Sequence, residues 1–181
     1  MQTNIIQMAP ELAVSRWFNT AEPITLSSLL GRPVLLHSFQ LLCPGCVSDS
    51  IPQIKKIERT FHQTDLVILG LHTVFEHHSA MSAVTLEAFI DEYRLKHPVG
   101  IDMAEEGLAT PITMRRYGMR GTPSSVLIGR NGEVLHHAYG VEDDLTVGAR
   151  LALAIGTPAG VSASSSASED NGCADGKCDV G

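Results

Sequence analysis

The sequence is poor in aromatic side chains and has no excess of positive charge. Aromatic residues make up 5% of the 181 positions, so the core must consist mainly of Leu, Ile, Val and Ala. Hydrophobic residues at 44% and charged residues at 18% are the balance of an ordinary globular chain that fills a core. The formal net charge of −7 argues against a general nucleic-acid binder, which would present a basic surface.

Long apolar runs are also missing. No segment reaches the roughly 18 apolar residues that span a bilayer, and the longest candidate, 34–42, is interrupted by His37, Ser38 and Gln40. The first seven residues lack a basic stretch followed by an apolar one, so a secretory signal is not expected. We therefore expect a cytoplasmic protein that binds neither membranes nor nucleic acid, unless the chain is a mature form whose signal has been removed.

Cysteine is scarce, and its four copies form two close pairs, Cys43/Cys46 and Cys173/Cys178. In a reducing cytosol such pairs are more typical of catalytic or metal-binding sites than of structural disulfides. The composition changes near Gly156, after which the chain is rich in Ser and Ala and cannot bury a core. We expect a folded domain at 1–156 and a flexible, disordered tail at 157–181 that carries the second pair.

Strand and helix patterns alternate along the expected domain, residues 1–156. The expected strands cover 34–39, 65–72, 99–101, 124–128 and 133–139, and the expected helices cover 44–62, 83–97, a short piece between Thr110-Pro111 and Gly118, and 143–155. Pro52 should kink or break the first helix. Asn131-Gly132 predicts a hairpin turn. This order predicts an α/β fold with a parallel core completed by an antiparallel hairpin.

Several other residues are expected to be structural. The spacing of Val84, Ala88, Tyr93 and Leu95 predicts the core-facing side of the second helix. The acidic residues Asp102, Glu105 and Glu106 are expected in a polar loop. The adjacent pairs His77/His78 and His136/His137 are expected to be solvated surface residues, since neighbours on a strand point to opposite faces and cannot chelate one metal ion.

Residues 43–46 read Cys-Pro-Gly-Cys and stand where a buried strand gives way to a helix. Free amide groups and the helix dipole at that position stabilise a thiolate on Cys43. Pro44 suits the first helical position, which needs no amide partner. Cys46 lies one turn further along the helix, within reach of a mixed disulfide at Cys43. The spacing therefore provides a nucleophile and its resolving partner.

The strand, the Cys-x-x-Cys helix and the distant sequence Gly-Thr-Pro at 121–123 before a hairpin resemble the thioredoxin superfamily over residues 20–156. The segment 25–33 and the extra helix after 70–73 resemble its TlpA-like and peroxiredoxin-like (AhpC-TSA, redoxin) branch. This resemblance implies a thioredoxin-like fold, a central mixed β-sheet flanked by helices. It also implies that Pro123 is cis and that Thr122 and Pro123 line a substrate groove facing the cysteines.

The sequence departs from the thioredoxin pattern at three places. Leu42 replaces the tryptophan before the first cysteine, Pro44-Gly45 reverses the usual order, and His37 replaces a buried aspartate. An imidazole at position 37 is a candidate proton relay for Cys46 near neutral pH. The alternative is a core histidine satisfied by backbone hydrogen bonds. These departures leave the direction of catalysis open.

The leading functional hypothesis is a thiol–disulfide oxidoreductase in which Cys43 attacks a disulfide and Cys46 resolves the product. The expected partners are a protein or small-molecule disulfide and a reducing thiol protein or small thiol, with no cofactor. Cys173 and Cys178 are candidate relay thiols, because the 16 residues of linker before them span roughly 20–24 Å when flexible.

Two alternatives come from the same cysteines. In a peroxiredoxin-like thiol peroxidase, peroxide would oxidise Cys43 to a sulfenic acid, although Gln40 stands where that family has Thr or Ser. In a non-enzymatic module, all four cysteines would supply thiolate ligands to zinc or copper(I). We expect no metal at Cys43 and Cys46 alone.

Overall fold

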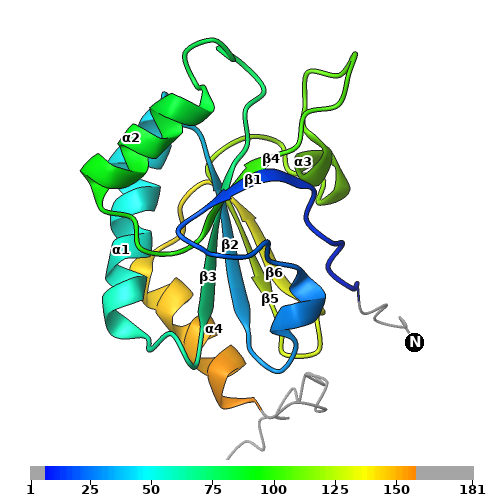
Figure 1. Cartoon of the computed structure of the whole chain (residues 1–181). Helices are drawn as coiled ribbons and strands as arrows, with labels where there is room; N and C mark the ends of the chain where they lie inside the picture. Colours follow the sequence, from blue (N-terminus) through cyan, green and yellow to red (C-terminus); the bar gives the residue numbers. More distant parts are fainter. Residues whose placement is uncertain (1–6, 158–181) are drawn as a thin grey trace, which may run out of the picture.

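The computed structural model describes residues 7–157, and a six-stranded sheet forms its centre (Figure 1). The strand order is β1-β4-β3-β2-β5-β6, with β2, β3 and β4 parallel to one another and the other pairings antiparallel. The strands are β1 (Val14–Phe18), β2 (Val34–Phe39), β3 (Val67–His72), β4 (Val99–Asp102), β5 (Ser124–Ile128) and β6 (Val134–Tyr139). The predicted mixed sheet with a closing hairpin is confirmed.

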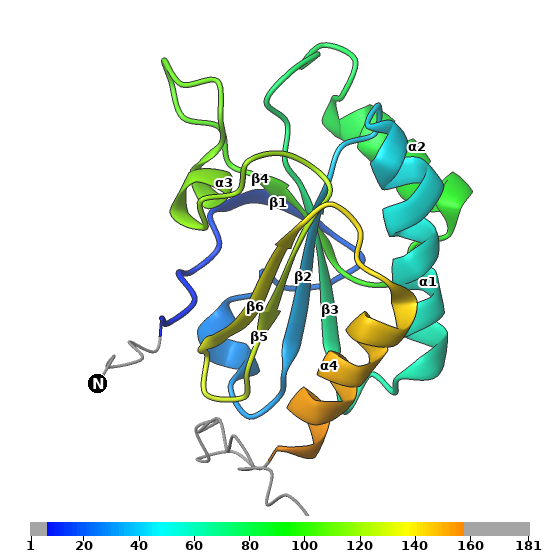
Figure 2. The ribbon, with the colours of Figure 1, turned by 180° about the vertical axis from the view of Figure 1, so that it is seen from behind.

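Helices cover both faces of the sheet, as Figures 1 and 2 show from opposite sides. One face carries α1 (Ile51–Thr60), α2 (Ala83–Tyr93) and α4 (Asp144–Gly156), and the other carries the 3-10 helix η1 (Leu26–Leu29) and α3 (Ile112–Arg116). All six residues of β2 are buried, as expected for a strand between two layers. Their alternation places Leu36 against η1 and α3 and Leu35 against α1 and α4.

The helix after the cysteines is irregular at its start. A π-helical turn, η2 (Cys46–Ser50), precedes α1, and the N–H of Ile51 donates to the carbonyl of Cys46. Pro52 therefore stands in the first turn of α1, directly after the π-helical turn, where it has no N–H to donate to a carbonyl of that turn. The expected interruption at Pro52 is present, and it takes the form of a wide turn between the cysteine pair and α1.

The second helix differs from its prediction in length and in its buried face. It ends at Tyr93 and not at 97, because Arg94 adopts a left-handed conformation with φ 52°. Leu86 and Ile90 face the core, whereas Val84 is 74% exposed. The predicted spacing belongs to a neighbouring side of the same helix, and Leu95 reaches the core from beyond the helix end.

The edge strand β1 was not predicted from the sequence. Its residues, Val-Ser-Arg-Trp-Phe, are mostly half-buried or exposed, and its pairing with β4 is irregular between Val14 and Arg16. An edge strand with one solvent-exposed face lacks the continuous apolar run that is typical of buried strands such as β2 and β3. Only contacts distant in sequence, such as Phe18 opposite Val99, define it.

Asp102 was predicted to lie in a polar loop, and this prediction is wrong. Asp102 ends β4 and is buried, and its carboxylate accepts hydrogen bonds from the backbone N–H groups of Thr113 (2.8 Å) and Met114 (3.0 Å). Burial raises its pKa, partly offset by these hydrogen bonds. The residue ties α3 to the sheet, a role that becomes visible only when segments 11 residues apart meet. Glu105 and Glu106 are exposed.

The part of the chain after α4 carries the predicted tail. The helix ends at Gly156, and apart from Thr157 the segment 157–181, with Cys173 and Cys178, lies outside the described residues. Within 7–157, none of the helices has the length and apolar character required to cross a bilayer.

Candidate active site

The two cysteines lie side by side at the carboxyl end of β2. The sulfurs of Cys43 and Cys46 are 2.6 Å apart, and the backbone N–H of Cys46 donates to the Cys43 sulfur at 3.3 Å. Cys46 is fully buried, whereas Cys43 is partly exposed. This difference suits Cys43 to meet a substrate and Cys46 to act afterwards from inside.

The loop before β5 packs against the cysteines. The peptide bond between Thr122 and Pro123 is cis, and the Thr122 carbonyl accepts a hydrogen bond from the Cys43 thiol at 3.4 Å. A Cβ atom at Gly45 would lie 3.7 Å from Cδ of Pro123, in ordinary contact. The structure thus brings together Cys43, Cys46, Thr122 and Pro123, four residues predicted from separate parts of the sequence.

An apolar side chain stands beside the accessible sulfur. Leu42, where thioredoxins have tryptophan, is 57% exposed. Pro44 is exposed as well. Together with the partly exposed Thr122 and Pro123, these residues form the accessible surface around Cys43.

Cys46 is held in its protonated form. Burial and the hydrogen bond to Cys43 together raise its pKa to about 12, although donors from the Gln40 backbone and the Thr122 side chain oppose the shift. A thiol with that pKa is ionised only to about one part in 10⁵ at pH 7. Because the thiolate is the attacking species, Cys46 needs a base when it resolves a mixed disulfide.

His37 is part of a chain of three titratable groups, two of which are buried. Its Nε2 lies 2.8 Å from Nε2 of His97, and Nδ1 of His97 lies 2.7 Å from a carboxylate oxygen of Glu58. His37 is 1% exposed and His97 is 4% exposed. Burial lowers the pKa of His37 well below its usual value, and the nearby His97 lowers it further. The alternative of a histidine satisfied by the backbone is not what the structure shows.

A glycine makes room for the two imidazoles. A Cβ atom at Gly70, on β3 between β2 and β4, would lie 3.1 Å from Nε2 of His97 and 3.2 Å from Nε2 of His37. Such contacts are too close for an unshifted side chain. Sequence reasoning did not identify His97 or Glu58. The signal that could have found them is a glycine within an otherwise apolar buried strand.

The free edge of His37 faces a small cavity beneath the active-site loop. Nδ1 of His37 has no hydrogen-bond partner within the described chain, and a cavity of about 20 Å³ is lined by His37, Ser50 and Pro123 among others. Ser50 is one turn beyond Cys46 on the same helical segment. A cavity of that size holds about one water molecule. It places His37 next to the helical segment that carries Cys46, although Cys46 itself does not line it.

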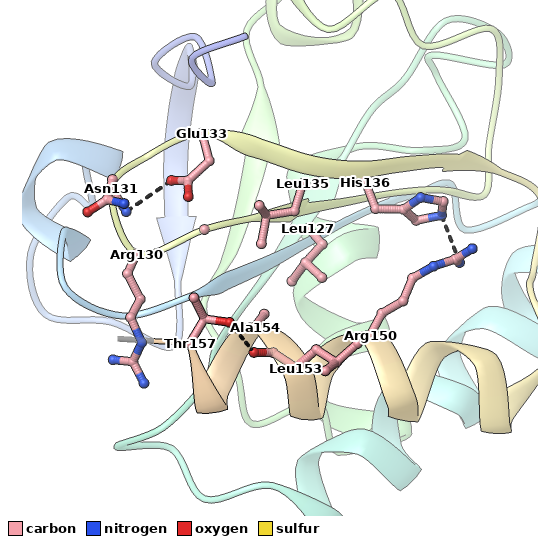
Figure 3. Close-up of a pocket in the computed structure, with 11 residues that line it drawn as sticks. Leu127, Arg130, Asn131, Glu133, Leu135, His136, Arg150, Leu153, Ala154 and Thr157 are labelled. Carbon is pink, nitrogen blue, oxygen red and sulfur yellow. Dashed lines mark hydrogen bonds between the residues drawn. The ribbon is translucent and has the colours of Figure 1, made fainter. Parts of the chain in front are cut away.

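A second cavity lies between the β5–β6 hairpin and α4 (Figure 3). Its volume is about 250 Å³, and none of the residues at the cysteine site lines it. His136 in its wall contacts Glu142 at 2.7 Å and Arg150 at 3.0 Å, so it is less solvated than expected, whereas His77 and His78 are exposed. Across residues 7–157 there is no cluster of three or more His, Cys, Asp or Glu residues suited to a metal.

Comparison with known proteins agrees with this architecture. The family model described as AhpC/TSA matches residues 5–137, which include the cysteine pair and the Thr122-Pro123 loop. The chain belongs to the AhpC/TSA family. The predicted relationship to the TlpA-like and AhpC-TSA branch of the thioredoxin superfamily is confirmed.

Solved structures of similar proteins cover nearly the whole described domain. The thioredoxin-like superfamily protein SPOA0173 is 45% identical with a TM-score of 0.81, covering 83% of this chain and 97% of that one. A thiol-disulfide isomerase from Corynebacterium glutamicum is 40% identical with a TM-score of 0.78, covering 82% of this chain and 97% of that one. The thioredoxin-like fold of this AhpC/TSA family member is therefore confirmed.

Curated relatives of this family member are more distant. The thiol-disulfide oxidoreductase ResA of Halalkalibacterium halodurans is 26% identical over 125 residues, which is 68% of this chain and 64% of that protein. ResA of Bacillus anthracis is 25% identical over 117 residues, which is 65% of this chain and 60% of that protein. The chain thus spans less than two thirds of the length of these curated relatives.

Proposed function

We propose that this AhpC/TSA family member is a thiol–disulfide oxidoreductase that exchanges electrons with client disulfides through Cys43 and Cys46. The observation that carries the proposal is the pairing of an accessible sulfur with a buried one at 2.6 Å, under the Thr122-Pro123 loop. Relatives named thiol-disulfide oxidoreductase and thiol-disulfide isomerase support it.

The reaction follows from the difference between the two sulfurs. The Cys43 thiolate attacks one sulfur of the client disulfide, which forms a mixed disulfide and releases the other client sulfur as a thiolate. Cys46 then loses its proton and attacks the Cys43 sulfur, so that the Cys43–Cys46 disulfide forms and the second client thiolate leaves. Two electrons pass from the cysteine pair to the client. A reducing thiol protein or small thiol restores the pair, and the same steps run backwards oxidise a client dithiol.

Trapping tests this proposal. A Cys46→Ser variant is expected to accumulate a mixed disulfide at Cys43 when mixed with a disulfide-containing peptide, because the neighbouring sulfur that would release it is gone. Mass spectrometry of the intact protein before and after a reductant measures the adduct. The Cys43→Ser/Cys46→Ser variant is the matched control, and a Cys46→Ser adduct below a tenth of the protein would contradict the proposed roles. Adding Cys173→Ser and Cys178→Ser shows whether tail thiols shorten the lifetime of the adduct.

We further infer that the chain of His37, His97 and Glu58 carries the proton that Cys46 must lose. Glu58 accepts Nδ1–H of His97, which leaves Nε2 of a neutral His97 to accept from Nε2–H of His37. A proton that reaches Nδ1 of His37 through the cavity that His37 and Ser50 line can therefore be passed on to His97. Burial discourages a charge on His37, whereas the Glu58 carboxylate stabilises an imidazolium at His97.

Replacing Glu58 by glutamine tests the proton path. The neutral amide no longer stabilises an imidazolium at His97, so the rate of mixed-disulfide resolution at pH 7 is expected to fall about tenfold. A merely structural role would leave the shape of the pH–rate profile unchanged, whereas loss of the path is expected to change that shape. Stopped-flow measurement of client release between pH 5.5 and 9 checks this.

The matched control for that variant is Glu142→Gln, which removes a carboxylate at the same 2.7 Å from a different histidine, His136. Glu142→Gln is expected to leave the profile unchanged. Identical pH–rate profiles for Glu58→Gln and the unmodified chain would overturn the path and leave the cysteine roles standing.

The remaining predictions from the sequence stand untested. These are the cytoplasmic location, the relay by Cys173 and Cys178, antioxidant activity as a peroxidase, and metal binding by all four cysteines. At the position of the peroxidase Thr or Ser, Gln40 is buried and its side-chain nitrogen has no partner among the described residues. It provides no hydroxyl toward a peroxide, so thiol–disulfide exchange remains the better-supported chemistry.

A further inference from the structure

A third cavity lies at the opposite end of the sheet from the cysteines. Its volume is about 670 Å³. It is placed where the parallel strands begin, since Arg32 stands just before β2, Val67 opens β3 and Pro98 immediately precedes β4. The cysteine pair follows the carboxyl end of β2, so this cavity is separate from the proposed redox site.

The charge of the cavity wall is the reverse of that of the whole chain. The chain carries a net charge of −7, yet five cationic side chains and a single carboxylate line this cavity. The cations are Arg32, Lys55, Arg59, Arg94 and Lys96, and the carboxylate is Glu58. Charges of one sign that converge on a concave surface with low-dielectric walls concentrate the electrostatic field there.

These cations are not neutralised by nearby carboxylates. Arg32, Arg59 and Arg94 take part in none of the ion pairs found within residues 7–157. Lys55 donates to the carbonyl of Tyr93 at 2.9 Å. Glu58 is already engaged by His97, and its pKa is lowered by that contact and by Lys96 although burial opposes the shift. The positive charge is therefore available to a ligand.

Apolar side chains also line the cavity. They are Ile24, Leu29, Phe61, Leu66, Val67, Ile68 and Pro98. Ligand sites typically combine such an apolar lining with a few polar groups that fix orientation, in volumes of about 300–1,000 Å³. An apolar body packed against these residues would leave its charged substituents to the guanidinium and ammonium groups of the same cavity.

We propose that this cavity binds a small organic anion that joins an apolar or aromatic body to at least two negative charges. Arginine favours phosphate and carboxylate alike, through paired N–H donors. Phosphorylated and carboxylated anions share this chemistry, and a binding experiment separates them. None of its cations contacts Cys43, Cys46 or the Thr122-Pro123 loop among the hydrogen bonds of the described chain, and the cavity shares only Glu58 and His97 with the proposed proton path.

Calorimetric titration of the reduced full chain tests the site with four probes. ADP represents an aromatic phosphate and benzene-1,2,4,5-tetracarboxylate an aromatic polycarboxylate, whereas pyrophosphate lacks the apolar body and adenosine lacks the charge. At least one aromatic anion is expected to bind with a Kd at or below about 0.1 mM and at least tenfold more tightly than pyrophosphate and adenosine. Raising the salt from 50 to 500 mM should weaken it severalfold.

Paired variants locate the binding. Arg32→Gln/Arg59→Gln is expected to weaken the aromatic anion at least tenfold. The control Arg16→Gln/Lys56→Gln changes the net charge equally, but removes cations that already pair with Glu87 and Asp144 outside the cavity, so its Kd should stay within twofold. Both variants should react with a disulfide peptide at the unmodified rate. Failure of both aromatic anions to bind, adenosine or pyrophosphate binding equally well, or equal losses in both variants would each overturn the site.

Discussion

Replacing Cys43 by serine is expected to lower the rate of disulfide reduction at pH 7 at least about 1,000-fold, because a hydroxyl is almost never ionised at that pH and cannot replace an attacking thiolate. The remaining groups of the site cannot substitute for it. Cys46 is fully buried and its pKa is raised to about 12, so it does not meet the client directly. Steady-state reduction of a fluorescent disulfide peptide, with a small dithiol as the electron source, measures the loss.

Two controls make this result specific. Cys43→Ser should keep the urea midpoint of the unmodified reduced chain, since a partly exposed thiol is exchanged for a hydroxyl of similar shape. The Cys173→Ser/Cys178→Ser variant keeps the Cys43–Cys46 pair, and its rate of disulfide reduction shows whether the tail cysteines contribute to that rate. If Cys43→Ser retained more than a tenth of the rate, another cysteine would be the nucleophile and the assignment of Cys43 would be wrong.

The parts of the site that could be predicted from the sequence are those encoded in short segments. The motif at 43–46 and the Gly-Thr-Pro sequence at 121–123 each carry their own local pattern, and a fold-level resemblance supplied the expectation that they meet. The order of strands and helices followed from apolar runs and turn residues in the same way. Such features depend on neighbours within a few positions along the chain.

The parts that were missed depend on contacts between distant segments. Glu58, His97 and His37 come from α1, from the segment before β4 and from β2, and no spacing along the chain relates them. Asp102 looked like one of several loop acids until its contact with the start of α3 was known. The buried side of α2 also depended on how the helix sits on the sheet. Gly70 is the exception, since a glycine in a central strand signals close approach by another group.

The exchange of a buried acid for His37 changes the electrostatics under the cysteines. A buried aspartate beside a thiol would carry or lack a charge according to its own pKa, whereas His37 is kept neutral by burial and by His97. The negative charge lies instead on Glu58, which is separated from His37 by His97. Glu58 is half-buried and lines the cavity proposed to bind an organic anion. The proton path therefore connects the interior beneath the active-site loop with the opposite end of the sheet.

Acid is expected to destabilise the fold through two buried histidines, His37 and His72. Both ring nitrogens of His72 lack a partner within the described chain, and burial lowers its pKa to about 4. Above pH 6.5 the folded and unfolded states are both neutral at this residue. Below 6.5 the unfolded chain takes up a proton that the folded protein does not, so stability falls by about 1.4 kcal/mol per pH unit until the folded pKa is reached.

His37 contributes a loss of the same sign, because its pKa is also lowered. From pH 7.5 to pH 5 the free energy of unfolding is therefore expected to drop by about 2–4 kcal/mol. Glu58, whose pKa is lowered, adds a loss only below about pH 4.5. Asp102, whose pKa is raised, acts in the opposite direction near its own titration. Urea unfolding of the reduced chain between pH 5 and 7.5 measures the slope.

The variant His72→Leu isolates one of the two contributions. It should reduce the difference in stability between pH 7.5 and pH 5 by about 2 kcal/mol, and it should also stabilise the fold at pH 7.5, since two unpaired nitrogens are replaced by apolar surface beside Phe39. His78→Gln, at an exposed position, is the control and should leave the slope unchanged. A slope as steep in His72→Leu as in the unmodified chain would mean that His72 is already protonated in the folded protein at pH 5, contrary to the effect of its burial.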